Sequence, residues 1–153
     1  MVNAYLHRLA GHGLREDEPL LEMTPENLYR SAREALGIAC KLGEKVILMG
    51  TSTGCTLALM LAADFPDLVD GLILYSIKIK NPWSPLLGGP WGLQITRVVH
   101  GGKYAVSASG NSEDCKYWYC RYRLEAQVYL QQLLKMRMNR KEFEKVRQPV
   151  FLG

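Results

Sequence analysis

Apolar and polar positions change their repeat several times along the first half of the chain, and each change predicts a new element. Residues 2–9 follow an extended, largely apolar pattern that predicts a short strand, and the glycines of AGHGL then force a turn. Residues 24–43 predict a helix, with Thr24 as its N-cap, Pro25 in the first helical position and Gly43 at its C-terminal cap. The apolar positions of this helix recur on one face, at Leu28, Ala32, Ala35, Leu36 and Ala39.

The next part of the chain predicts a buried βαβ unit. Residues 45–49 are short and almost wholly apolar, a pattern typical of a strand covered on both faces in a parallel sheet. Residues 53–64 are apolar nearly all round, which predicts a buried helix whose small residues let it lie close on the sheet. Residues 71–76, GLILYS, predict a second buried strand. Strand, helix and strand in this order predict an α/β fold with a mostly parallel sheet and flanking helices.

The pattern becomes irregular after residue 76. The stretch KNPWSPLLGGPWG is rich in proline, glycine and tryptophan and predicts a loop, whereas residues 116–140 predict one long helical stretch or two. The last residues, RQPVFLG, predict the start of one more core strand. We therefore expect an α/β core at residues 1–76, a largely helical insertion at 77–146 and the next core strand from 147 to 153.

Composition is that of an ordinary globular domain, with 48% hydrophobic and 22% charged residues in a chain of 153. No apolar run reaches the roughly 18 residues that a membrane-spanning helix needs, and the N-terminus has no signal-peptide pattern, so we expect a cytoplasmic protein without stable membrane insertion. The net charge is +4, and residues 135–147 are its main source. We interpret them as the solvated face of a helix, with a patch for an anionic partner as the alternative. No nucleic-acid motif accompanies them, so no nucleic-acid partner is expected.

The four cysteines do not have the spacing of a zinc site, so no metal is expected. Cys40 and Cys55 fall in apolar helical pattern and are interpreted as small core residues. Cys115 and Cys120 lie in an aromatic, basic stretch and are expected to be free thiols in a reducing compartment.

A serine stands between two glycines where the first strand of the βαβ unit meets its helix, in VILMGTSTGCTLALMLA. Ser52 must occupy a sharp turn there, and Gly50 and Gly54 are expected to relieve the crowding of its backbone. The hydroxyl would stand clear of the sheet, and the backbone N–H of Thr53 would point to where an oxyanion forms. This predicts a nucleophile for acyl transfer; a serine that merely caps the helix is the alternative.

With these features the chain resembles the α/β-hydrolases, in the branch of monoacylglycerol lipases and small carboxylesterases. The matching stretches are RLAGHGL, VILMGTSTGCTLALMLAADFPDLVDGLILYS and RQPVFLG. The resemblance implies Ser52 as nucleophile, Thr53 N–H as one oxyanion donor, and no cofactor. It identifies the helical insertion at residues 77–146 with the cap of this family. It also implies that the second oxyanion donor precedes Val2 and that the catalytic aspartate and histidine follow Gly153. The chain is accordingly expected to be a piece of a longer hydrolase.

The acidic and basic residues of the chain offer Ser52 no partner. His12 is expected to bond to the backbone of its Gly-His-Gly turn, His7 to belong to its strand, and His100 to lie on the surface of the cap. Three aspartates follow the serine, but they cluster at the amino end of the sheet, opposite to it: Asp64, Asp67 and Asp70.

Two functions fit this pattern. The first is a serine hydrolase that acts on a carboxylic ester with an apolar acyl group through an acyl-enzyme on Ser52, inactive as this chain alone. The apolar group is suggested by the aromatic and apolar residues of the cap, for which packing in the core is the alternative: Trp83, Trp91, Trp118, Tyr119, Tyr122, Leu130 and Met136. The second is a non-catalytic remnant that serves as a binding or interaction module. Uncovered strand edges make a homodimer one expectation for either.

Overall fold

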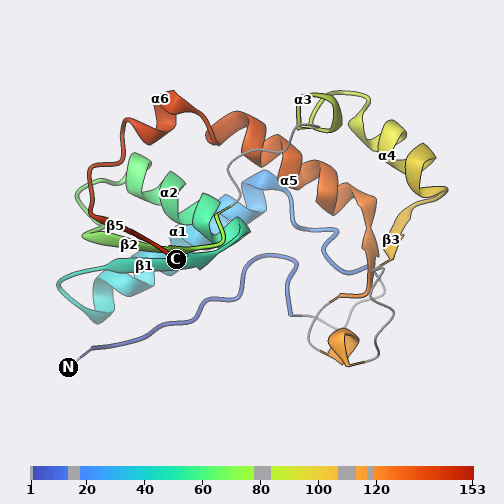
Figure 1. Cartoon of the computed structure of the whole chain (residues 1–153). Coiled ribbons are helices and arrows are strands. Elements are labelled where there is room, and N and C mark those ends of the chain that lie inside the picture. Colours follow the sequence, from blue (N-terminus) through green and yellow to red (C-terminus); the bar gives the residue numbers. More distant parts are fainter. Residues whose placement is uncertain (1, 14–17, 78–83, 107–112, 117–118) are drawn as a thin grey trace.

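The computed structural model, which describes residues 2–13, 18–77, 84–106, 113–116 and 119–153, contains a three-stranded parallel sheet toward one side of the molecule (Figure 1). Its strands are β1 (Ile47–Thr51), β2 (Gly71–Tyr75) and β5 (Val150–Leu152), in the order β1-β2-β5. Met49, Ile73 and Phe151 lie side by side across the sheet. The predicted α/β class with a parallel sheet is confirmed.

Two helices cover one face of this sheet in layers. α2 (Thr53–Asp64) follows β1 directly and packs on β1 and β2, and α1 (Pro25–Leu42) packs on α2. The Thr24 side chain accepts a hydrogen bond from the backbone N–H of Asn27 and so caps α1 as predicted. The buried core joins α1, α2 and the covered face of the sheet, with Leu28, Cys55, Leu61, Ala62, Leu72 and Leu74 among its members.

The second half of the chain leaves the sheet and returns along one long helix. α3 (Ser84–Leu87) and α4 (Gly92–His100) lead to a hairpin of β3 (Tyr104–Val106) and β4 (Arg121–Arg123), which are antiparallel. α5 (Leu124–Arg137) follows β4 at once and contacts α1, α2, α3 and α4 (Figure 1). A short 3₁₀ turn (Asp114–Lys116) precedes β4, and α6 (Arg140–Phe143) precedes β5. The helical stretch predicted from residue 116 therefore begins only at Leu124, because residues 121–123 pair with β3 instead.

The structure corrects two predictions about strands. Residues 2–9 form no strand: Val2 and Leu6 are 95% and 91% exposed, because no neighbouring strand pairs with this segment. β1 is not buried on both faces either. Ile47 and Met49 are 62% and 66% exposed, since α2 covers only the opposite face, and in the described part of the chain nothing covers this one.

Candidate active site

The turn between β1 and α2 has the backbone conformation of a tight strand-to-helix bend. Ser52 has φ 52° and ψ −110°, in the positive-φ region that L-residues rarely adopt. Its N–H donates to the carbonyl of Tyr75 at the end of β2 (3.2 Å), and its carbonyl accepts from the N–H of Cys55 (3.1 Å). Main-chain hydrogen bonds from the sheet and from the helix therefore fix the serine in this bend.

Gly50 allows the close approach that the bend requires, whereas Gly54 does not. A Cβ on Gly50 would lie 2.5 Å from the carbonyl carbon of Gly54 and 2.7 Å from the nitrogen of Cys55, so a side chain cannot fit. A Cβ on Gly54 would meet no atom within 4 Å. The predicted relief of crowding is thus confirmed for Gly50 and wrong for Gly54, because β1 approaches the helix at the first glycine alone.

The groups that chemistry would use at this bend have no competing partners. Ser52 is half-buried, and its hydroxyl makes no hydrogen bond within the described ranges. Thr53 takes the first position of α2, where a backbone N–H has no acceptor inside the helix. The neighbouring thiol is occupied: Cys55 Sγ donates to the carbonyls of Gly50 (3.1 Å) and Tyr75 (3.2 Å). Burial also raises the pKa of Cys55, so its thiol is a poorer nucleophile than a free cysteine.

No histidine is placed to activate Ser52 by a hydrogen bond in the part of the chain that the structure describes. His12 Nδ1 contacts the carbonyl of Ala10 at 3.0 Å, which confirms the expected bond to the backbone of its turn. His7 Nδ1 contacts the hydroxyl of Tyr5 at 3.1 Å, and His100 is exposed at the end of α4. The residues around His7 and His12 line a cleft of about 330 Å³ against the first half of α1, and Ser52 is not part of its lining.

The aspartates lie away from the serine, as predicted. Asp70 and Val46 form two hydrogen bonds with each other just before β2 and β1 begin. The N–H of Val46 donates to the Asp70 carboxylate, and the N–H of Asp70 donates to the Val46 carbonyl, each at 2.8 Å. Asp64 ends α2 and accepts hydrogen bonds from Tyr29 (2.5 Å) and Arg137 (2.6 Å). Ser52 follows β1, so the whole strand separates it from Asp70.

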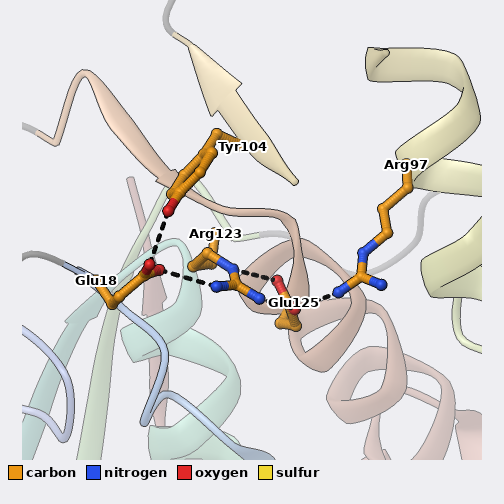
Figure 2. Close-up of polar contacts among 5 residues, drawn as sticks. All are labelled: Glu18, Arg97, Tyr104, Arg123 and Glu125. Atoms are coloured by element: carbon orange, nitrogen blue, oxygen red, sulfur yellow. Dashed lines mark hydrogen bonds and ion pairs between the residues drawn. The ribbon is translucent and has the colours of Figure 1, made fainter. Parts of the chain in front are cut away.

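An ionic cluster that the sequence did not reveal joins the hairpin to the first half of the chain (Figure 2). Tyr104 and Arg123 both donate to the carboxylate of Glu18, at 2.7 and 3.1 Å. Arg123 also donates twice to Glu125 (2.6 and 3.1 Å), which accepts a further bond from Arg97 (2.8 Å). The hydrogen bonds from Arg123 hold the pKa of Glu125 at about 2. Glu18 and Arg123 are 105 positions apart, and no pattern in the sequence connects them.

Cap residues that were expected to be aromatic pocket lining or core are dispersed. Trp83 and Trp118 lie outside the described residues, and Trp91 and Met136 are exposed. Tyr122 and Leu130 pack against the buried core, and Tyr119 is half-buried.

The expectation that Cys115 and Cys120 are free thiols is wrong. Cys115 and Cys120 form a disulfide next to β4, whereas Cys40 and Cys55 are free, half-buried and buried respectively. Cys115 lies in the 3₁₀ turn and Cys120 directly precedes β4, and their Cα atoms are 5.3 Å apart. No three metal-ligating side chains gather within the described ranges.

Three of the six basic residues between positions 135 and 147 form ion pairs. Arg137 binds Asp64, Arg140 binds Glu144 and Lys145 binds Glu142, all within 2.7 Å. No helix among the described residues is long and apolar enough to cross a bilayer.

Comparison with known proteins places the fold among those of lipolytic enzymes. No family model and no curated protein sequence matches the chain. A structure from work on LipS and LipT, two metagenome-derived lipolytic enzymes, is similar over 95% of this chain and 57% of its own, with a TM-score of 0.64 and 16% identity. The monoacylglycerol lipase of Paleococcus ferrophilus is similar over 84% of this chain and 53% of its own, with a TM-score of 0.54 and 20% identity. The chain thus spans little more than half the length of each and has part of an α/β-hydrolase-like fold.

Proposed function

We propose that the chain carries the nucleophile of a serine hydrolase that acts on carboxylic esters. The observation that carries the proposal is Ser52, held at positive φ between a parallel strand and a helix with its hydroxyl unbonded among the described residues. A nucleophile elbow requires this backbone geometry, with the serine at the carboxyl end of a strand and a helix N-terminus beside it. The fold shared with lipolytic enzymes supports ester chemistry over other uses of such a turn.

In this mechanism the Ser52 oxygen attacks the ester carbonyl, and the tetrahedral oxyanion accepts a hydrogen bond from the N–H of Thr53. The alcohol leaves, and water then hydrolyses the acyl-enzyme to release the acid and restore the serine. A general base must take the serine proton, and we propose that it comes with an acid from sequence beyond Gly153. Residues 1–76 and 147–153 would form the catalytic core, and residues 77–146 the cap that meets an apolar acyl group.

A second candidate is a non-catalytic binding module. It is favoured by one observation: no histidine or carboxylate bonds to Ser52 among the described residues. In that case the exposed sheet face that contains Ile47 and Met49 would be a contact surface, and a homodimer would be one way to cover it.

The test is fluorophosphonate labelling of the protein expressed from its complete reading frame, with the adduct located by mass spectrometry. We expect a single adduct on Ser52 that is lost in Ser52→Ala. Ser76 is the matched control, because it too has φ 52° and follows a parallel strand, so Ser76→Ala should retain labelling. Absence of an adduct on Ser52 in folded protein would favour the binding module.

Location is tested separately by fractionation of the source cells. We propose a cytoplasmic protein, and the Cys115–Cys120 disulfide is the feature at odds with this, because disulfides persist mainly in oxidising compartments. Recovery of the protein outside the cytoplasm would overturn that part of the proposal.

A further inference from the structure

The returning segment of the chain is fastened to the first half at two points that differ in burial. At the end of α5, Arg137 donates to Asp64, which also binds Tyr29 of α1; we call these three residues the Asp64 cluster. Just before α5, Arg123 and Tyr104 bind Glu18, and we call these three the Glu18 cluster (Figure 2). The Asp64 side chain is 23% exposed, whereas that of Glu18 is 37% exposed.

Both oxygens of Glu18 are used by the hairpin. Tyr104 of β3 donates to Oε1, and Arg123 of β4 donates to Oε2. The guanidinium of Arg121 lies 3.5 Å from the centre of the Tyr104 ring and adds positive charge beside the hydroxyl. Together these groups lower the pKa of Glu18, with the Tyr104 hydrogen bond as the largest cause. The Glu18 contact therefore depends on the charge of one partly exposed carboxylate.

Release of Glu18 leaves no buried charge without a partner. Arg123 keeps two hydrogen bonds to Glu125, which lies on the same continuous segment and moves with it. Glu125 in turn keeps Arg97 of α4 (Figure 2). The freed Glu18 carboxylate would pass into water. Because Arg123 stays paired with Glu125, and water can bind the freed Glu18 carboxylate and Tyr104 hydroxyl, the contact can open at a much lower cost than a buried ion pair.

The Asp64 cluster differs from it in lower exposure and in a second attachment beside it. Separation of α5 from α2 would leave Asp64 bound to Tyr29, and Arg137 paired with Glu142 of α6 (3.2 Å), so the pairing of charges does not distinguish the two clusters. Gln148 next to β5 also binds the carbonyls of Ala62 and Pro66, which holds the end of α2 to the returning chain. This end is consequently the firmer of the two attachments.

We propose that the Glu18 cluster is a salt-sensitive fastening of the cap, which opens about the Asp64 cluster. On opening, β3, β4 and α4 move away from the loop that contains Glu18, while the end of α5 stays on α2. Mobile ions screen exposed pairs strongly, and the Debye length falls to about 3 Å at 1 M salt, so ionic strength sets the fraction open. The proposal concerns cap motion alone and does not depend on catalysis at Ser52.

The test is hydrogen exchange of the full protein measured by mass spectrometry between about 20 mM and 1 M sodium chloride. In the wild type, we expect salt to raise exchange about two- to fivefold in residues 18–23, 104–106 and 121–123, and to leave α1 and α2 unchanged. Glu18→Gln should exchange fast in these segments already at low salt and should respond no further to salt.

Two matched variants complete the experiment. Glu22→Gln removes an exposed carboxylate from the same loop that makes no ion pair in the described part of the chain, and it should behave as the wild type. Asp64→Asn should instead raise exchange at the ends of α2 and α5. A wild-type response to salt in Glu18→Gln would overturn the proposal, as would a salt effect spread equally over α1 and α2.

Discussion

The hydroxyl of Tyr29 donates a hydrogen bond of 2.5 Å to the carboxylate of Asp64, and the same oxygen accepts a second bond from Arg137. One carboxylate oxygen thereby joins α1, the last residue of α2 and the last residue of α5. Burial, followed by the bond to Asp64, raises the pKa of Tyr29 to about 12. The interface between the three helices is consequently sensitive to alkali.

Tyr29→Phe should lower stability at neutral pH by about 1 kcal/mol, because Asp64 loses one of its two donors. The pKa of Tyr29 is raised in the folded state, so its contribution is complete below pH 10 and is lost as pH rises toward 12. Urea unfolding of both proteins should show a difference that narrows over this window. Tyr5→Phe, at an exposed tyrosine, should show no such narrowing.

Glu125 should make the protein sensitive to acid. Its pKa is lowered from 4.5 to about 2, so its contribution is complete above pH 4.5 and is lost as pH falls toward 2. The shift corresponds to stability on the order of 3 kcal/mol. Thermal unfolding from pH 6 to pH 2 should therefore be less steeply pH-dependent in Glu125→Gln than in the wild type. Equal slopes in the two proteins would contradict the assignment.

The two glycines that flank Ser52 should respond in opposite ways to alanine. Gly50→Ala should destabilise by more than about 2 kcal/mol, because its Cβ would collide with backbone atoms that cannot move independently. Gly54→Ala should be neutral or stabilise by up to about 1 kcal/mol, since the site is open and lies in a helix. The measurement is chemical unfolding of both variants. An equal loss of stability in the two would show that the bend needs both glycines.

Glycine in place of Ser52 should stabilise the protein while removing fluorophosphonate labelling. The residue has positive φ, which glycine adopts without strain, and its hydroxyl has no bond to lose within the described ranges. We expect a gain of about 1 kcal/mol in unfolding free energy. Ser76→Gly should change stability in the same direction but keep the label. A loss of stability in Ser52→Gly would show that the strain is not relieved.

Reduction of the disulfide should cost about 2 kcal/mol of stability, the value expected for a loop of six residues. The measurement is thermal unfolding with and without a dithiol reductant, with Cys115→Ser and Cys120→Ser combined as the control that should show no further effect of reductant. Alkylation of the native protein without reductant should modify neither cysteine. Modification of either one would contradict the disulfide.

The sequence predicted those elements whose determinants are local. Thr24 caps its helix through a residue three positions away, and the strands at 47–51 and 71–75 flank a helix that is apolar all round. The bend at Ser52 was predictable for the same reason, because Gly50, the serine and the start of the helix are contiguous. Its chemical role remains a prediction.

Features that depend on distant partners were beyond the sequence. Whether a strand is covered depends on what other segments reach it, so the pattern at residues 45–49 wrongly indicated two buried faces. Residues 2–9 have a strand-like pattern but no neighbouring strand to pair with them. The Glu18 contacts join residues that lie far apart in the sequence, and the sequence alone does not indicate which charged residues pair.

The carbonyl of Tyr75 and the N–H of Cys55 hold the backbone of Ser52 through hydrogen bonds. Nearby, the geometry requires the absence of a side chain at position 50, where glycine stands. Because backbone groups determine this bend, its geometry depends little on which side chains lie next to it. Most of the neighbouring residues could therefore be substituted during evolution while Ser52 keeps the same position and orientation.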